Sequence, residues 1–126
     1  MKYNQYRFKF YLNATHSIYI DGQLGEEHPH TWEITIQTIK VKEDFITFNA
    51  IEKDMEKYLD SFQDRYLNKN APFITLNPTL ENICIYFKEA FQKILVQKGW
   101  LLLSIEMSET PTRSYMIDIS DEIKIN

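Results

Sequence analysis

The sequence predicts a single α+β domain in which two helices cover one face of an antiparallel sheet. Three observations carry this prediction. Apolar and polar residues alternate near both ends of the chain, two stretches with helical periodicity lie between them, and the 126 residues contain no linker, repeat or low-complexity segment. The expected order is β-β-α-α-β-β, with a four-stranded sheet formed within one domain over residues 1–126.

The first two strands are predicted from a period of two, which places alternate side chains on one face of a sheet. One parity of the first run is apolar and ends on a histidine: Tyr6, Phe8, Phe10, Leu12, Ala14 and His16. One parity of the second run begins with two histidines and continues apolar: His28, His30, Trp32, Ile34 and Ile36. Residues 17–27 between the runs are expected to form a loop, with turn signals at Asp21-Gly22 and Gly25.

Two helices are predicted from apolar stripes that follow a change of period at Lys42-Glu43-Asp44. The first stripe, expected to end near Leu67, contains Ile51, Met55, Tyr58, Leu59 and Phe62. The second stripe contains Leu80, Ile83, Cys84, Phe87, Phe91, Ile94 and Leu95. Asn77-Pro78-Thr79 supplies capping side chains and a first-turn proline to the second helix, and Gly99 stands where a C-terminal glycine belongs.

The last third of the chain returns to strands. The third strand is expected to place Leu101, Leu103, Ile105, Met107 and Glu109 on one face. A turn at Thr110-Pro111-Thr112 leads into a fourth strand over residues 113–119. A four-stranded sheet has two open edges, and open edges pair with other chains, so we expect a homo-oligomer.

Composition excludes several classes of function. The net charge is −4, the apolar fraction is 44%, and no basic tract indicates a nucleic-acid or membrane-surface partner. The polar start Met1-Lys2-Tyr3-Asn4-Gln5 is not typical of a signal peptide, and no apolar run reaches the ~20 residues of a membrane helix. The only cysteine, Cys84, lies in a helical stripe and is more typical of a buried core thiol than of a nucleophile. A cytoplasmic protein is the expectation.

The three histidines form a candidate metal site. His28 and His30 are two residues apart on a strand and therefore point to one face, and His16 ends the core-facing parity of the neighbouring strand. Three imidazoles with a fourth position open are typical of catalytic zinc sites. The alternative is that His-x-His is only the start of a strand and that no metal binds.

Four motifs in order resemble the 6-pyruvoyltetrahydropterin synthase and 6-carboxytetrahydropterin synthase family over roughly the whole chain. They are Ala14-Thr15-His16, then His28-Pro29-His30-Thr31-Trp32, then Arg65-Tyr66-Leu67-Asn68 with Asn77-Pro78-Thr79-Leu80-Glu81-Asn82, and finally Ser108-Glu109-Thr110. The resemblance implies the tunnelling fold, in which the sheets of several subunits join into a barrel. It also implies a trimer or a hexamer of two stacked trimers.

The resemblance assigns roles to five residues. Zinc would be held by His16, His28 and His30, Glu109 would anchor the pterin ring, and Thr79 would help to hold the ring at a subunit interface. A carboxylate on an apolar face needs donors, and the N–H groups of a 2-aminopterin match it. The alternatives are a Glu109 that tilts into solvent at the strand end and a Thr79 that only caps a helix.

The chain also departs from the family pattern. The loop at residues 22–27 lacks the usual cysteine, the usual Asp-His pair is replaced by Gln63 and Asp64, and Pro29 replaces a glycine between the metal histidines. Glu26, Glu27 and Asp64 are the carboxylates that could move protons instead, since part of the family uses a glutamate in place of the cysteine. The alternative is that the two loop carboxylates, Glu26 and Glu27, are merely solvated.

Two functions follow from the resemblance. The first is a zinc-dependent lyase acting on a dihydroneopterin or dihydroneopterin triphosphate type of pterin. The second is a catalytically inactive member that binds a pterin or a related ligand as an oligomer.

Overall fold

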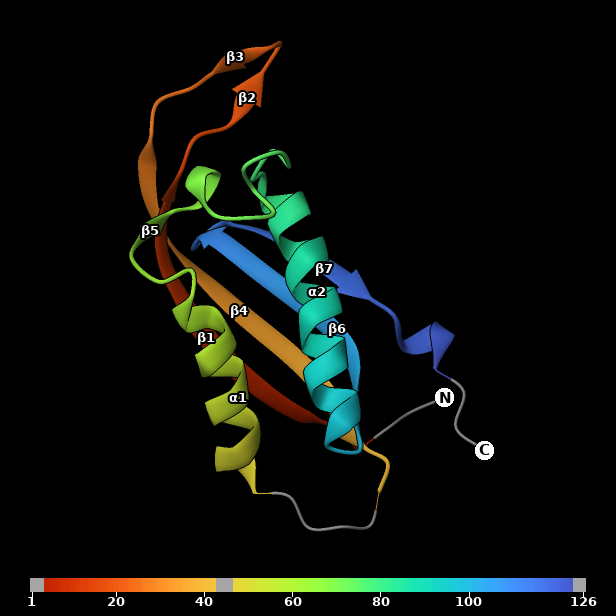
Figure 1. Cartoon of the computed structure of the whole chain (residues 1–126). Helices are drawn as coiled ribbons and strands as arrows, with labels where there is room; N and C mark the ends of the chain where they lie inside the picture. The colour runs from red at the N-terminus through yellow and green to blue at the C-terminus, as the bar shows by residue number, and fades with distance from the viewer. Residues whose placement is uncertain (1–3, 43–46, 124–126) are drawn as a thin grey trace.

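The computed structural model describes residues 4–42 and 47–123, and these form one layer of helices on one layer of sheet (Figure 1). The strands are β1 (Tyr6–His16), β2 (Tyr19–Ile20), β3 (Gln23–Leu24), β4 (His28–Lys40), β5 (Arg65–Tyr66), β6 (Trp100–Thr110) and β7 (Arg113–Asp118). The helices are α1 (Phe48–Asp60), α2 (Leu80–Gln97) and two short 3₁₀ turns, η1 (Leu67–Lys69) and η2 (Ser120–Glu122). The expectations for Met1–Tyr3 and for the change of period at Glu43-Asp44 lie outside the described residues.

The main sheet has five strands in the order β5-β1-β4-β6-β7. Its four long strands pair antiparallel, as the sequence predicts, but β5 pairs parallel with β1 through Ala14↔Arg65 and Thr15↔Tyr66. The sheet is therefore mixed and five-stranded, and the prediction of a purely antiparallel four-stranded sheet is wrong in this respect. A strand of two residues carries no periodic signal, so the sequence pattern could not reveal β5.

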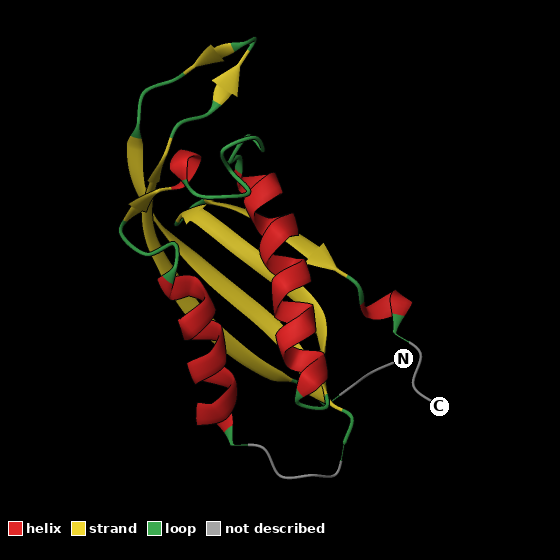
Figure 2. Cartoon of the chain, in the orientation of Figure 1, coloured by secondary structure: helices red, strands yellow, loops and turns green. Residues whose placement is uncertain are grey.

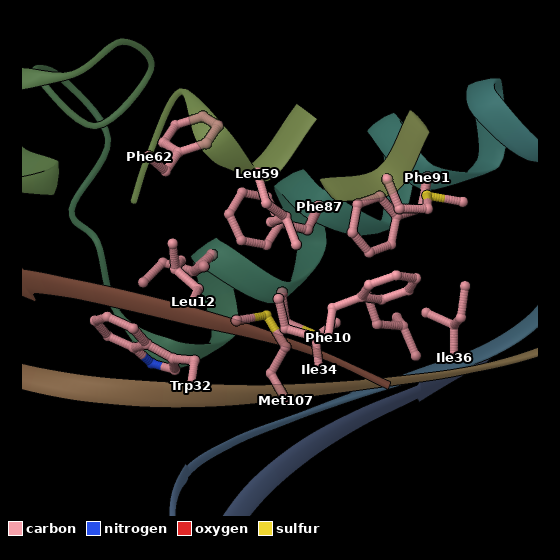
Figure 3. Packing of buried hydrophobic residues seen from close by; sticks show 14 of the residues in the cluster. Phe10, Leu12, Trp32, Ile34, Ile36, Leu59, Phe62, Phe87, Phe91 and Met107 are labelled. Atoms are coloured by element: carbon pink, nitrogen blue, oxygen red, sulfur yellow. The ribbon is translucent and has the colours of Figure 1, made fainter. Parts of the chain in front are cut away.

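Both long helices lie on the same face of the sheet, and the opposite face is left without a helix among the described residues (Figures 1 and 2). Both predicted helical stripes face the sheet and are buried or partly buried, including Ile51 and Met55 of α1 and Phe87 and Phe91 of α2. Figure 3 shows Phe87 and Phe91 of α2 facing the strand residues Phe10 and Ile34. No helix of the described residues is long and apolar enough to span a membrane.

Helix α1 ends at Asp60, several residues before the predicted end near Leu67. After it, Asp64 adopts a positive φ of 59°, which turns the chain toward the sheet edge, and its N–H donates to the Asn13 carbonyl at 2.6 Å. The Gln63 side chain forms the hydrogen bonds that a neighbouring strand would form with the edge of β1. It accepts from the Asn13 N–H at 2.9 Å and donates to the Tyr11 carbonyl at 2.7 Å. Gln63 and Asp64 therefore pair with the edge of β1, although the apolar stripe alone predicts that the helix continues through them.

Helix α2 begins and ends close to its predicted bounds. The Thr79 hydroxyl accepts from the Asn82 N–H at 3.1 Å, which confirms an N-cap role for this residue. Pro78 precedes the cap and so lies outside the first turn where it was expected. At the other end Gly99 has a φ of +77°, the left-handed conformation that favours glycine after a helix.

A β-bulge in β6 changes which of its residues face the helices. The register with β4 passes from Gln37↔Ser104 to Thr38↔Leu102, which leaves Leu103 as the extra residue. Beyond the bulge Ile105 and Met107 face the core, as predicted, but before it the core residues are Trp100 and Leu102. The expected shared face of Leu101 with Ile105 is therefore wrong, because a bulge inverts the parity of a strand, whereas Leu103, the extra residue, is itself buried.

The segment predicted as a loop at residues 17–27 contains the small hairpin β2–β3, which projects beyond one end of the sheet (Figure 1). Two asparagines hold its first strand. Asn68 accepts from the N–H of Ser17 and donates to its carbonyl, at 2.9 and 2.8 Å. Asn77 does the same with Tyr19, at 2.9 and 3.0 Å. These bonds fix the chain immediately after His16.

Candidate metal centre

The three histidines meet at the end of the sheet from which the β2–β3 hairpin projects. Antiparallel pairing places His16 of β1 directly opposite His28 of β4, and Ala14 opposite His30. Since His28 and His30 share a face, all three imidazoles lie on the helix-covered side of the two strands. Their ring centroids are 4.5 to 5.1 Å apart, and one nitrogen of each ring lies within 4.8 Å of the others.

Hydrogen bonds to backbone carbonyls orient two of these rings. His16 Nδ1 lies 2.8 Å from the carbonyl oxygen of Pro78, and His28 Nδ1 lies 3.0 Å from that of Glu26. A carbonyl can only accept, so Nδ1 donates in both cases and Nε2 keeps its lone pair. Protein ligands to metals use this arrangement, in which the second ring nitrogen donates to a carbonyl and fixes the tautomer.

The burial of His16 supports metal binding. Its side chain is fully buried, and its Nε2 has no hydrogen-bond partner in the described structure. Burial lowers the pKa of His16, against the opposing effect of the bond to the Pro78 carbonyl, and burial also lowers the pKa of His30. The neutral, unprotonated imidazole that a metal requires is therefore the favoured form of both rings. The three histidines fit a bound metal ion.

Glu109 of β6 joins this cluster. It lies between the pairs Ser108↔Ser114 and Thr110↔Arg113, where the register of β6 with β7 shifts, and such irregularities redirect side chains. One carboxylate oxygen, Oε1, lies 3.5 Å from His16 Nε2 and 3.7 Å from His30 Nε2. The side chain is only 10% exposed, so the alternative of a glutamate tilted into solvent is wrong.

Two surface recesses reach the cluster through His30. The first has a volume of about 480 Å³ and is lined by Asn13, Ala14, Thr15, Pro29, His30, Thr31 and Asp64. The second has a volume of about 450 Å³ and is lined by Tyr11, Pro29, His30, Thr31, Glu33, Ser108, Glu109, Thr110 and Pro111. The structure therefore brings Asp64 to a recess with one predicted metal ligand, and Glu109 to a recess with the same ligand.

The remaining predicted site residues lie around this centre. The Glu27 carboxylate accepts from the Thr15 hydroxyl at 2.7 Å, and Thr15 lines the first recess. Glu26 is exposed and reaches the cluster through its backbone carbonyl, which accepts from His28. Thr79 follows Pro78, the residue whose carbonyl orients His16, and its hydroxyl oxygen caps α2.

Sequence reasoning missed the groups that orient the ligands. The carbonyls of Pro78 and Glu26 act through the backbone, which every residue has, so no residue type signals them. Asn68 and Asn77 belong to the motifs shared with the family, but their hydrogen bonds to the chain after His16 span about 50 residues or more of sequence. The spacing of asparagines in a sequence does not indicate such contacts.

Comparison with known proteins places the chain in a family. The sequence matches the family described as 6-pyruvoyl tetrahydropterin synthase over residues 5–119. The chain belongs to this family. No curated protein matches the sequence. The predicted resemblance is therefore confirmed, and the family is one of lyases that bind pterin substrates.

Solved structures with a 6-pyruvoyl tetrahydropterin synthase fold resemble the chain at low identity. The Caenorhabditis elegans 6-pyruvoyl tetrahydropterin synthase has a TM-score of 0.76 and 18% identity, covering 91% of this chain and 94% of its own. An uncharacterized protein from Wolinella succinogenes has 0.68 and 15%, covering 91% and 97%. A catalytic-residue mutant of the Plasmodium vivax enzyme, with alanine in place of a glutamate, has 0.65 and 12%, covering 90% and 97%. At these identities the structures show a shared fold, and the chain is a divergent member of the family.

Proposed function

We propose that this protein is a zinc-dependent lyase that acts on the side chain of a dihydroneopterin or dihydroneopterin triphosphate. The observation that carries the proposal is the convergence of His16, His28 and His30, with two Nε2 atoms left free by carbonyl bonds on Nδ1. Family membership adds the pterin as the class of substrate.

Zinc is the metal that fits the donor set. Three neutral imidazoles from rigid strands are a common ligand set for catalytic Zn²⁺, and hard cations such as Mg²⁺ prefer oxygen ligands. When bound, zinc supplies a Lewis acid that polarises the hydroxyl or carbonyl oxygens of the pterin side chain. The role of His16, His28 and His30 in this chain is to hold the ion at the mouth of the two recesses that His30 lines.

Glu109 and Thr79 are the proposed pterin contacts. The buried Glu109 Oε1 has no hydrogen-bond partner in the described structure, so it can accept from the N–H groups of a 2-aminopterin. The Thr79 hydroxyl accepts from Asn82, which leaves its own proton free to donate to a ligand. Capping and ligand binding are therefore compatible at Thr79.

Glu26, Glu27 and Asp64 are the proposed proton carriers. Of the three, Glu27 and Asp64 have the better support, since Asp64 lines the recess at His30 and Glu27 is hydrogen-bonded to Thr15 of the same recess. The Plasmodium vivax enzyme has a glutamate among its catalytic residues, so a carboxylate can take part in catalysis on this fold. A carboxylate near the metal would remove a proton from the side-chain carbon or hydroxyl and return it later in the reaction.

A homo-oligomer is part of the proposal. The outer edge of β7 has no partner strand among the described residues, and β5 covers only two residues of the β1 edge. Pairing of such edges between copies would join the sheets into the barrel of the family, as a trimer or as a hexamer. A particle mass of 15.1 kDa by light scattering, the mass of one chain, would contradict this part.

The alternative function is a catalytically inactive oligomer that binds a pterin or a related ligand. One observation favours it specifically. Gln63, at a position where the family's active enzymes are expected to carry an acid–base residue, instead holds the edge of β1 through one hydrogen bond accepted from Asn13 and one donated to Tyr11. A side-chain amide is neither an acid nor a base of suitable pKa near neutral pH, so Gln63 cannot act as the proton carrier at this position.

The deciding experiment measures turnover of dihydroneopterin and its triphosphate by the zinc-loaded protein. We expect turnover, and we expect at least one of Glu26→Gln, Glu27→Gln and Asp64→Asn to lower kcat by ~10²-fold or more, the scale of general acid–base catalysis. Glu89→Gln, on the exposed side of α2, is the matched control and should leave kcat unchanged. Saturable pterin binding without turnover would favour the inactive binding protein, and absence of both would contradict the proposal.

A further inference from the structure

The Glu109 carboxylate lies closer to the three histidines than the binding of a pterin ring requires. A single oxygen, Oε1, approaches the two ring nitrogens of His16 and His30 at 3.5 and 3.7 Å. His28 supplies the third nitrogen of the cluster. The carboxylate is thus directed at the histidine nitrogens themselves, in addition to lining the second recess.

These separations are close to those between neighbouring ligands of one metal ion. With Zn–N and Zn–O bonds of about 2.1 Å in a tetrahedral site, two ligand atoms are about 3.4 Å apart. The distances from Glu109 to His16 and His30 exceed this value by only a few tenths of an ångström. A direct hydrogen bond would be shorter, near 2.7–2.9 Å for a charged pair. The spacing therefore suits a shared ion better than a contact between the side chains alone.

The negative charge of Glu109 is only weakly compensated by the groups described around it. Oε1 is buried and accepts no hydrogen bond from residues 4–42 or 47–123, and the facing His16 Nε2 has no partner among them either. Arg113 approaches only the other oxygen, at 3.8 Å, and its side chain is 70% exposed, so its charge is strongly screened. A cation between Oε1 and the imidazoles would satisfy both orphaned atoms at once.

The geometry points to Glu109 as a fourth protein ligand, which closes the metal site of His16, His28 and His30 in the absence of substrate. An entering ligand with N–H donors would draw the carboxylate away and open one coordination position. This second step rests on the proposed pterin function, whereas the closed four-ligand site does not. Substrate would thus create the open site that a lyase needs.

The test uses cobalt and zinc alone on the full chain. Co²⁺ bound by four protein ligands in a tetrahedral site absorbs strongly in the visible, and expansion of the coordination by water weakens the absorption. We expect strong bands in the wild type, weaker bands in Glu109→Gln, and a loss of at least tenfold in Zn²⁺ affinity, measured by competition with a chromophoric chelator. Wild-type affinity and an unchanged spectrum in Glu109→Gln would overturn the proposal.

Two further variants make the result specific. Glu106→Gln is the matched control, because Glu106 lies on the same strand and bonds to Ser114, away from the histidines. It should keep the wild-type affinity and spectrum. Glu109→Asp keeps the charge but shortens the side chain, so a ligand role of Glu109 predicts that this variant also loses Zn²⁺ affinity. A purely electrostatic role predicts wild-type affinity, and that result would overturn the proposal. Circular dichroism establishes that each variant is folded.

Addition of dihydroneopterin to the cobalt protein tests the opening step. We expect the tetrahedral bands to decrease as the pterin binds. Turnover of dihydroneopterin with unchanged bands would show that Glu109 stays in place and would overturn the opening step. A loss of metal affinity in Glu109→Gln without any pterin binding would support the closed site and would contradict the proposed function instead.

Discussion

The middle of the helix-covered sheet face and its histidine end are built on the same strands with the same residue parity, but they differ in chemistry. In the middle, Phe10 and Ile34 are buried under α2, and Phe10 meets Phe91 with a ring-centroid distance of 6.0 Å (Figure 3). At the end, the same parity places His16 and His30 beside Glu109, where His16 Nε2 and Glu109 Oε1 are buried without a hydrogen-bond partner in the described part of the chain.

The difference lies in what covers the sheet. Over the middle, α2 presents apolar side chains, and its backbone groups are satisfied within the helix. At the histidine end α2 has not yet begun, so the carbonyl of Pro78 is free to accept from His16. Polar side chains are therefore placed where the covering layer still offers backbone acceptors. The comparison shows that parity determines which face a residue takes, while the covering element determines which chemistry that face supports.

The largest effect is expected from the middle of the face. Ile34→Ala should lower the free energy of unfolding by about 2–5 kcal/mol, because Ile34 is fully buried and its loss leaves a cavity between sheet and helices. Urea unfolding measures this value. The metal stoichiometry of the folded fraction should stay at the wild-type level, and a loss of metal from folded Ile34→Ala would show that the two regions are coupled.

The second prediction concerns the histidine end, where a substitution should weaken metal binding and leave the stability of the fold nearly unchanged. His28→Ala should weaken Zn²⁺ binding roughly 100-fold or more, because loss of a group that only orients a ligand already costs 10–100-fold. The unfolding free energy of the chelator-treated protein should change by less than about 1 kcal/mol, since His28 is only partly buried and surface changes are small. Isothermal calorimetry with zinc measures the affinity, and unaltered zinc binding would exclude His28 as a ligand.

Much of the difference between the apolar middle of the sheet face and its histidine end could be predicted from the sequence. The shared parity of His16 with the apolar residues of its strand predicts that it ends the core-facing side, and it does so as the last residue of β1. The prediction that a strand begins at His28 is also confirmed. The same alternation predicts Glu109 on the face of Met107, and its carboxylate does lie on that side, beside His16. These predictions succeeded because a period of two is a local property that needs no knowledge of the partner elements.

The rest depends on long-range contacts that local patterns do not contain. The capture of Gln63 and Asp64 by the edge of β1 ended α1 early, and the bulge at Leu103 changed the parity of β6. Neither has a signal in the alternation of apolar residues. The carbonyl of Pro78 as a partner of His16 is likewise set by the packing of α2 on the sheet. Tertiary contacts therefore determine where α1 ends, where β6 has its bulge and which carbonyl orients His16.

A smaller effect separates the two roles of Thr79 at the start of α2. Thr79→Ala should destabilise the protein by about 1 kcal/mol, the usual cost of losing an N-cap. Thr79→Asn keeps a capping side chain but removes the hydroxyl, so thermal unfolding should stay close to the wild type. If the hydroxyl also contacts the pterin, Thr79→Asn should still weaken dihydroneopterin binding. Equal binding by Thr79→Asn and the wild type would leave Thr79 with the cap alone.

The smallest effect concerns pH, and it should appear only at the histidine end. Burial lowers the pKa of His16 and of His30 in the folded protein below the ordinary value of 6.5. Below pH 6.5 the unfolded chain therefore binds more protons than the folded one, so the stability of the chelator-treated protein should fall as the pH decreases from 6.5. The Pro78 carbonyl and the Glu109 carboxylate oppose the effect of burial on His16, which keeps the change small.

Unfolding measured by urea between pH 5 and 8 tests this sign. The double variant His16→Gln/His30→Gln should lose most of the pH dependence in this window, whereas Ile34→Ala should be less stable but keep the wild-type slope. The lowered pKa values of the carboxyls of Asp54 and Asp118, caused by hydrogen bonds from Lys98 and Ser120, act only below their ordinary value of 3.8 and so do not interfere. Stability that rises on acidification through 6.5 would mean that the folded protein takes up protons at these histidines. In that case Glu109 would hold charged imidazoles in the metal-free protein, and the histidine end would be an ion-pair cluster until a metal displaces the protons.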